Sequence, residues 1–292
     1  MTRQWLRTKL EEVRQATTIH GGAFSACAAA VGVKLSRLPI PSRRLRLLLY
    51  RTVYGQRYSA LNEGELDRPL AEYPSLNALF TRGVRPECRP IADAPGQFLA
   101  PCDGKVQEVG RLQGDRILTV KGVEYTISSL LPNVDTRPFA DGHFAIVFLS
   151  PCDCHRVFSP QDAQVEEVIH VPGYRLLVHP PFQKKDYPVF TLNERVILRL
   201  RTPLGTCALV LVAGWGVGNI TLPVDTAFRP RARKLMRKTY APSLRVNRGE
   251  WLATFELGST AILITEPVAA LTPLVRRDDA VRYGQPLFGP TG

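Results

Sequence analysis

The chain has 292 residues, of which 45% are hydrophobic and 22% charged, which is ordinary for a globular protein with one large core or two smaller ones. Its six cysteines are too few for a disulfide scaffold in a chain of this length, so we expect reduced thiols. The longest apolar stretch, residues 23–33, has 11 residues, whereas a membrane-spanning helix needs about 20. No convincing secretory signal is visible.

The net charge of +12 is unevenly distributed. Residues 1–57 carry about +9 of it, because they hold 11 Lys or Arg and two Glu. A second basic cluster comprises Arg229, Arg231, Arg233, Lys234, Arg237 and Lys238. Two solvated faces would explain both clusters, but basic surface also suits a nucleic acid or an anionic membrane. Zinc-finger spacings, RNA-binding signatures and interleaved aromatic residues are missing, so we expect a membrane surface and no nucleic acid.

The pattern of residues 1 to about 60 is helical. Apolar residues from Leu6 to Val13 recur on one face, and Pro39 interrupts the periodicity. Ser42 is placed to cap a second helix that runs through Tyr54. This second helix mixes arginines with leucines and two tyrosines, a composition typical of a helix lying in a membrane interface. A helix packed on its own domain would fit the same pattern.

From about residue 95, short β-rich runs replace the helical pattern. They cover residues 117–121, 144–150, 195–200, 207–214, 251–257 and 261–266. Turn dipeptides separate them, including Asp103-Gly104, Gly114-Asp115 and Asp141-Gly142. The sequence therefore predicts an α+β protein, in which a helical, membrane-associating segment at residues 1–65 precedes a mostly antiparallel β body at residues 66–292.

Several polar residues are expected at strand ends. Gly258-Ser259-Thr260 lies between two strand runs, where a simple bend would also fit. Asp103 belongs to an Asp-Gly dipeptide that favours a hairpin, and His155 follows a hydrophobic strand. Each signal is weak alone, and a lone histidine is more often structural. Together they supply a nucleophile, a base and an orienting carboxylate.

A metal site is the competing interpretation of the cysteines. Cys152, Cys154 and His155, with Cys102 beside Asp103, could provide thiolate and imidazole ligands for zinc. The C-x-C spacing is unusual for a zinc knuckle, however, and two adjacent ligands would strain a tetrahedral site. We therefore expect no metal.

Seven stretches, in order, resemble the phosphatidylserine decarboxylase family. They are YPSLNALFTRGVRPECRPI (73–91), APCDGKV (100–106), LSPCDCHRVFSP (149–160), VPG (171–173), LNERV (192–196), VAGWGVGNI (212–220) and RGEWLATFELGST (248–260). The resemblance thus runs from about residue 73 to the C-terminus, whereas the N-terminal helices match only in character.

The resemblance implies a proenzyme that cleaves itself between Gly258 and Ser259. Ser259 would attack the carbonyl carbon of Gly258 and form an ester, and elimination would leave dehydroalanine. Hydrolysis with loss of ammonia would then give a pyruvoyl cofactor, formally a bound pyruvate, at the start of chain 259–292. The family decarboxylates phosphatidylserine to phosphatidylethanolamine. It therefore implies a phospholipid substrate, a large and a small chain, a homodimer, and a peripheral place on the cytoplasmic face of the cell membrane.

Three positions carry the implied catalysis. Ser259 becomes the pyruvoyl group, Asp103 matches the family's autocleavage aspartate, and His155 matches the histidine assigned to decarboxylation, a proton transfer that suits the usual pKa of histidine. Phe158 departs from the family, because a second histidine at this position is the usual cleavage base. Either His155 takes over that role, with His143 or His179 as further candidates, or the chain is a non-cleaving, lipid-binding relative. Decarboxylation of another amino-acid headgroup stays open.

Overall fold

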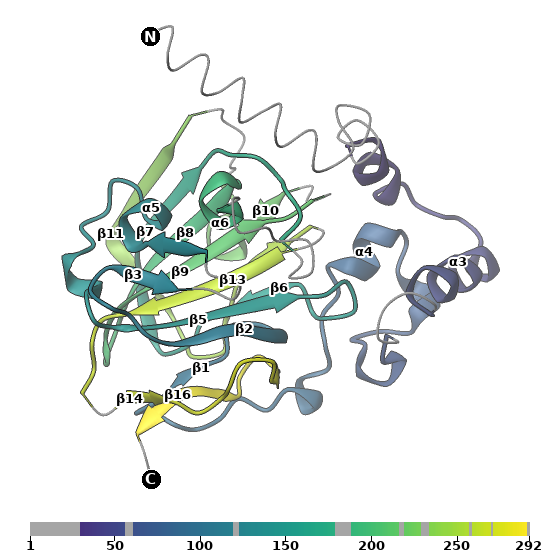
Figure 1. Ribbon diagram of the computed structural model, residues 1–292. Helices are drawn as coiled ribbons and strands as arrows, with labels where there is room; N and C mark the ends of the chain where they lie inside the picture. Colours follow the sequence, from purple (N-terminus) through teal and green to yellow (C-terminus); the bar gives the residue numbers. More distant parts are fainter. Residues whose placement is uncertain are drawn as a thin grey trace, which may run out of the picture.

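The computed structural model describes residues 30–55, 61–118, 123–178, 188–215, 219–228, 234–256, 259–269 and 271–290. It confirms the α+β class, since a few short helices precede a body of antiparallel sheets (Figure 1). The predicted helix at residues 6–13, Gly258 and His179 lie outside the described residues. The boundary between residues 65 and 66 stays a prediction.

The helical segment is anchored to the rest of the protein by tyrosines. Residues 30–36 are helical, and α3 (Arg43–Gly55) begins directly after Ser42, whose Oγ accepts a hydrogen bond from the Leu45 amide at 3.3 Å. This confirms the predicted cap. On the inner face of α3, the Tyr50 hydroxyl donates to the Tyr73 carbonyl at 2.9 Å, and Tyr54 is also buried.

Short helical turns lead from this segment into the body. They are η1 (Glu63–Glu65), η2 (Leu70–Glu72), α4 (Leu76–Phe80) and η3 (Pro86–Cys88). The Ser75 side chain caps α4 by accepting from the Ala78 amide at 3.1 Å. Among the described helices, none is long and apolar enough to cross a membrane.

An eight-stranded antiparallel sheet forms the centre of the body. Its order is β11 (Met236–Val246), β7 (Ala163–Val171), β8 (Arg195–Thr202), β9 (Gly205–Ala213), β13 (Ser259–Thr265), β5 (His143–Leu149), β2 (Gly104–Arg111) and β15 (Ala280–Val281). The β13 strand therefore has neighbours on both sides, and all seven of its residues are buried. Within the described part of the sheet, β13 lies near the middle (Figure 1).

Smaller elements cover the two faces of this sheet. The second sheet has the order β10 (Ile220–Thr221), β12 (Trp251–Phe255), β6 (Arg156–Phe158), and the third has β1 (Phe98–Leu99), β16 (Pro286–Pro290), β14 (Leu271–Pro273). A hairpin of β3 (Arg116–Leu118) and β4 (Glu124–Thr126) leads into α5 (Ile127–Leu130), and the remaining short helices are η5 (Arg137–Phe139), α6 (Val189–Leu192) and η7 (Pro223–Asp225).

Residues alternate between two core layers, as the period of a strand requires. Leu211 and Ala261 pack with Val157 of β6 and Phe255 of β12 in one layer, and Ile262 lies in the other. We call the first the inner layer. Ser259 lies two residues before Ala261 in β13 and therefore on the same face of the strand, so its side chain is directed into the inner layer.

The strand register gathers the sequence motifs at one edge of the central sheet. Ser259 lies opposite Leu149, the last residue of β5, on one side, and opposite Ala213, the last residue of β9, on the other. Lys105, near the start of β2, lies opposite Phe148. The starts of β2, β8 and β13 and the ends of β5 and β9 therefore meet at this edge.

The predicted hairpin at Asp103-Gly104 is wrong. Gly104 is the first residue of β2, which pairs with β5, whereas β1 pairs with β16. Its φ is +152°, and a Cβ there would come within 2.3 Å of the Phe148 carbonyl oxygen. Glycine is required because the backbones of β2 and β5 approach each other closely here.

Candidate active site

Ser259 opens the β13 strand and is fully buried. Within the described residues, its Oγ has no hydrogen-bond partner. The amide of Ala213 donates to the Glu194 carbonyl at 2.9 Å, and its carbonyl accepts from Asn193 Nδ2 at 2.7 Å. Both backbone groups of Ala213 therefore point toward β8, which makes Ala213 and Ser259 a non-hydrogen-bonded pair with closely spaced side chains. A small methyl group is thus the direct neighbour of the Ser259 hydroxyl.

His155 lies in the loop between β5 and β6, directly before β6 of the second sheet. Its carbonyl accepts from the Phe255 amide at 2.9 Å, which ties it to the end of β12, four residues before Ser259. The ring is completely buried, and its centroid lies 3.8 Å from that of Phe80. Its Nδ1 is 3.0 Å from the Asp153 carbonyl oxygen. Because a carbonyl can only accept, Nδ1 carries the proton, and Nε2 is left as an unprotonated acceptor.

The surroundings of His155 keep its imidazole neutral. Burial, and then the charge of Arg82, lower its pKa to about 3, and the Asp153 carbonyl only partly opposes them. His155 is therefore neutral in the uncut chain, and its role in returning a proton during decarboxylation stays a prediction. Its Nε2 is buried and has no partner among the described residues, so it can accept a proton.

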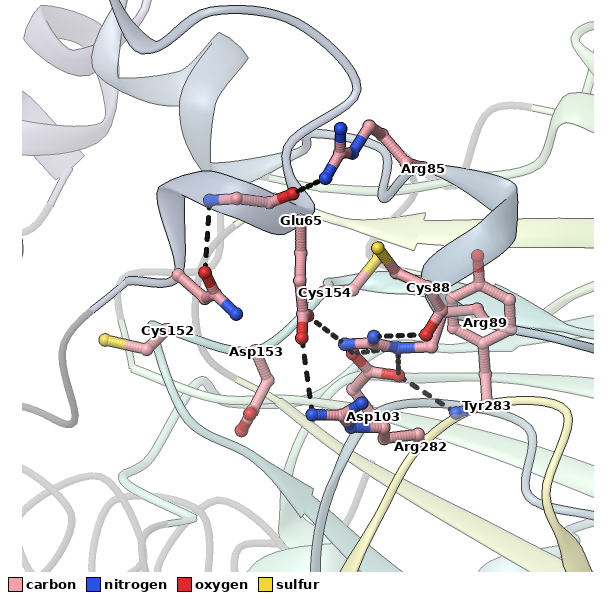
Figure 2. Close-up of polar contacts among 12 residues, drawn as sticks. Glu65, Arg85, Cys88, Arg89, Asp103, Cys152, Asp153, Cys154, Arg282 and Tyr283 are labelled. Atoms are coloured by element: carbon pink, nitrogen blue, oxygen red, sulfur yellow. Dashed lines mark hydrogen bonds and ion pairs between the residues drawn. The ribbon is translucent and has the colours of Figure 1, made fainter.

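Asp103 is enclosed by cations and amides. Its carboxylate accepts from Arg89 Nε at 3.1 Å and Nη2 at 2.6 Å, and from the Tyr283 amide at 2.9 Å. Arg89 also binds Glu65 at 2.8 Å, and Glu65 contacts Arg282 at 3.3 Å (Figure 2). We call these five residues the Asp103 cluster. Burial disfavours the charge of Arg89, but the two carboxylates outweigh it and raise its pKa.

The structure does not join Asp103 to a histidine. Within the described residues, the hydrogen bonds of the Asp103 side chain go to Arg89 and Tyr283, and His155 Nδ1 bonds to a carbonyl instead. Phe158 stacks on the Tyr283 ring, with 3.8 Å between centroids and 17° between planes. An aromatic pair therefore lies beside the carboxylate, where the resemblance leads one to expect an imidazole.

The described histidines other than His155 do not take the place of that imidazole. His143 lies opposite Thr265, six residues along β13 from Ser259, which corresponds to about 20 Å. It is therefore at the wrong end of the strand to act on Ser259. His170 Nε2 is 3.0 Å from Glu194 Oε1, on the far side of β8 and β9. His179 lies outside the described residues.

The cysteines offer no support for the zinc interpretation. Among the described residues, no group of three or more His, Cys, Asp or Glu side chains is placed to hold a metal ion. Burial raises the pKa of the Cys154 thiol to about 11, with a further contribution from Asp103, and burial also raises that of Cys102. Both thiols are therefore protonated at neutral pH in the metal-free chain.

Two buried arginines were missed by the sequence interpretation. Arg82 and Arg89 lie in the stretch 73–91, which carried part of the resemblance, but nothing in it indicated a role for either. Their exposed fractions are 3% and 7%. Arginine is almost never this buried without a partner, so only the structure reveals that each one organises a polar region.

Comparison with known proteins identifies the family of the chain. The family described as phosphatidylserine decarboxylase matches residues 76–289. A phosphatidylserine decarboxylase proenzyme of Halorhodospira halophila is 36% identical over 261 residues, which is 87% of this chain and 84% of that protein. One from Anaeromyxobacter sp. (strain K) is 34% identical over 272 residues, covering 91% and 94%, and one from Myxococcus xanthus is 32% identical over 244 residues, covering 83% and 86%. The chain therefore belongs to the phosphatidylserine decarboxylase family and is a carboxy-lyase.

Proposed function

We propose that this protein cuts itself between Gly258 and Ser259 and then decarboxylates phosphatidylserine to phosphatidylethanolamine. The observation that carries the proposal is the Ser259 hydroxyl at the start of β13, which is buried and has no hydrogen-bond partner among the described residues. Leaving a buried hydroxyl without a hydrogen bond costs about 1–3 kcal/mol, and such groups are rare in folded proteins. The relatives are named as proenzymes, and these names support the same conclusion.

Ser259 is the nucleophile of the cleavage, and His155 Nε2 is its base. As the Ser259 oxygen bonds to the Gly258 carbonyl carbon, its proton passes to Nε2 and then to the departing Ser259 nitrogen. The peptide bond thereby becomes an ester. Loss of the Ser259 α-proton expels the Gly258 carboxylate and leaves dehydroalanine, and water then releases ammonia and leaves a pyruvoyl group. General-base assistance of this kind contributes about 10²–10⁴-fold to a rate.

The surroundings of Ser259 fit the pyruvoyl group. That group supplies a ketone that can take up the substrate amine and accept electrons as CO2 leaves. Ala213 and the inner layer provide a closed apolar wall, which excludes water from the reacting atoms. His155 is the residue we assign to returning a proton at Nε2 after CO2 has left.

We assign Asp103 to holding the edge of the sheet rather than to proton transfer. Its bonds to Arg89 and the Tyr283 amide fix the entry to β2 against the C-terminal segment. This role differs from the orienting of a base that the resemblance implied.

Intact-mass analysis tests maturation. The purified protein should contain chains 1–258 and 259–292, the second blocked by pyruvoyl, and Ser259→Ala should stay full-length. Ser159→Ala is the matched control, because Ser159 is equally buried but its Oγ donates to the Gln161 carbonyl at 2.7 Å. Only full-length wild type with unmodified Ser259, after incubation with membranes, would favour the non-cleaving, lipid-binding alternative.

The headgroup is tested separately. Processed protein should release CO2 from phosphatidylserine in vesicles and not from free serine or from a phospholipid with another amino-acid headgroup. Release from another headgroup would leave the cleavage proposal intact and reject the substrate. The homodimer stays a prediction that light scattering of the processed protein can check.

We further propose that the helical segment rests on the cytoplasmic face of an anionic membrane. The support is the charge of about +9 in residues 1–57 together with apolar side chains on the described part of the segment that face solvent. These are Val31, Leu35, Leu38, Leu45, Leu48 and Val53, each more than 40% exposed. Basic residues beside exposed leucines are the combination that binds a lipid interface.

Vesicle sedimentation tests this placement. Binding to anionic vesicles should weaken as salt rises, because surface charge is screened over about 8 Å at physiological ionic strength. Leu48→Glu should reduce binding, whereas Leu274→Glu should not, because Leu274 is an exposed leucine of the β body. Equal binding to neutral and anionic vesicles would reject the electrostatic part of the proposal.

A further inference from the structure

Arg82 is a buried cation whose side-chain hydrogen bonds, within the described residues, go to carbonyl groups and not to carboxylates. It follows α4 and donates to the carbonyls of Leu79 at 3.2 Å, Cys152, and Asp153 at 3.0 Å. Its own carbonyl accepts from the Cys154 thiol at 3.7 Å. A buried guanidinium that forms no ion pair costs free energy, so its position calls for an explanation beyond packing.

The Asp153 carbonyl links Arg82 to His155. The oxygen accepts from Arg82 Nη2 at 3.0 Å and faces His155 Nδ1 at 3.0 Å. Arg82 therefore holds the acceptor that fixes both the orientation and the tautomer of the imidazole. This leaves Nε2 as an unprotonated, buried nitrogen that, like the Ser259 hydroxyl, has no hydrogen-bond partner among the described residues.

We propose that Arg82 is a positioning residue, which acts through the Asp153 carbonyl to hold His155 as the base for Ser259. The proposal rests on the proposed function and names a role in it that the resemblance did not. Nothing in it requires Arg82 to touch the substrate.

The charges around His155 agree with this role. Arg82 is the cation that acts on the ring, and it helps to lower the pKa of His155. The Asp153 carboxylate is turned to the Ser150 amide at 2.7 Å, and burial raises its pKa. Phe80 of α4 and the Phe255 amide of β12 complete the surroundings without adding charge. Removing the guanidinium should therefore let the ring protonate at higher pH.

Nitrogen NMR of uncut protein tests the proposal without relying on cleavage. In full-length Ser259→Ala with labelled histidine, His155 should hold its proton on Nδ1 and stay neutral between pH 5 and 8. Adding Arg82→Gln should weaken this tautomer and bring the titration of His155 toward the ordinary value of 6.5. An unchanged tautomer and titration would overturn the proposal.

Cleavage kinetics provide the second measurement. In newly translated protein, Arg82→Gln should slow cleavage by about 10²-fold, the typical cost of a misplaced catalytic group, and the loss of rate on the acidic side should begin at a higher pH than in the wild type. Equal slowing at every pH would show a purely structural role. Arg156→Gln is the control, because Arg156 lies nearby over Trp251 and donates to the Thr81 carbonyl, and it should leave both readouts unchanged.

Arg82→Lys tests the positioning role of Arg82 even if Arg82→Gln does not fold. Lysine keeps the charge but loses the fork that binds three carbonyls. Cleavage should slow while its pH dependence stays that of the wild type, and cleavage at the wild-type rate would overturn the orienting role. If the wild type itself does not cleave, the proposed function fails, but the NMR result on His155 still stands or falls independently.

Discussion

Two buried polar regions meet at the same edge of the central sheet and are built in opposite ways. In the Asp103 cluster, both carboxylate oxygens have partners and Arg89 contacts two acids. In the second region, His155 Nε2 and Ser259 Oγ are buried without a partner among the described residues. The first region resembles an ordinary stabilising network (Figure 2). The second leaves the two groups that we propose as base and nucleophile with free lone pairs.

This difference separates stability from chemistry. A satisfied network contributes to folding and loses free energy when one member is removed. A buried group without a partner lowers stability by about 1–3 kcal/mol, so its retention is most easily understood as a requirement of the reaction. Substitutions in the two regions should therefore have different effects: on the rate of cleavage in one and on the free energy of unfolding in the other.

The largest effect is expected at His155. His155→Ala should slow self-cleavage by about 10²–10⁴-fold, because it removes the base from Ser259. His143→Ala is the matched control, since it is also a buried histidine but lies at the far end of β5. Time-resolved gels of newly translated protein measure both rates. Rapid cleavage of His155→Ala would mean that the base is elsewhere, and His179 would be tested next.

Arg89→Leu should leave the Asp103 charge buried and unpaired. We expect uncut protein to lose about 3–5 kcal/mol of unfolding free energy, measured by urea denaturation of the Ser259→Ala background. The double variant Arg89→Leu with Asp103→Leu should be less destabilised than Arg89→Leu alone, because neither charge then remains. A double variant that is worse than both single variants would show that packing, and not the ion pair, dominates the cluster.

Phe158→His connects the two regions. The new imidazole would lie against Tyr283, whose amide binds Asp103, and could recover an aspartate-oriented base. Cleavage should then accelerate by about tenfold or more, within the range that general-base assistance allows. If the carboxylate stays fully bound to Arg89, the buried ring lacks a partner and the variant loses stability without a gain in rate. Parallel rate and melting measurements separate the outcomes.

The smallest effect is expected at Glu65, on the outer side of the cluster. Burial raises its pKa, but Arg89 and Arg282 outweigh burial and hold the pKa below the ordinary value of 4.5. Its stabilising contribution is therefore complete above pH 4.5 and is lost as the pH falls through the lower, folded-state pKa. Glu65→Gln should remove this part of the acid dependence, at a cost below about 1 kcal/mol at pH 7. An unchanged acid profile would contradict the assignment.

The sequence predicted the strands whose apolar residues form continuous runs. Those corresponding to β5, β8, β9, β12 and β13 are confirmed. The β7 strand was missed because Glu166 and Glu167 interrupt its apolar pattern. On the sheet, these carboxylates meet Arg199, Arg201 and Arg237 of the neighbouring strands. Charge pairs between strands depend on register, which a single sequence does not reveal.

The site could be predicted only in part, for a similar reason. The motifs correctly indicated that Asp103, His155 and Ser259 would lie at strand ends, and the register brings those ends to one edge. Their partners could not be predicted. Arg89 binds Asp103 because η3 brings it over the start of β2, and such a contact leaves no periodic signal in the sequence.

The position of β13 has a consequence for the lifetime of the enzyme. A cut before Ser259 frees the end of a strand that lies between β5 and β9 and whose seven residues are all buried. The precursor can insert this strand as part of one continuous chain, but a denatured mature enzyme would have to recruit it from solution as a separate peptide. Maturation would thus make folding a one-way event, and the durability of the processed enzyme would depend on how slowly it unfolds and not on its ability to refold.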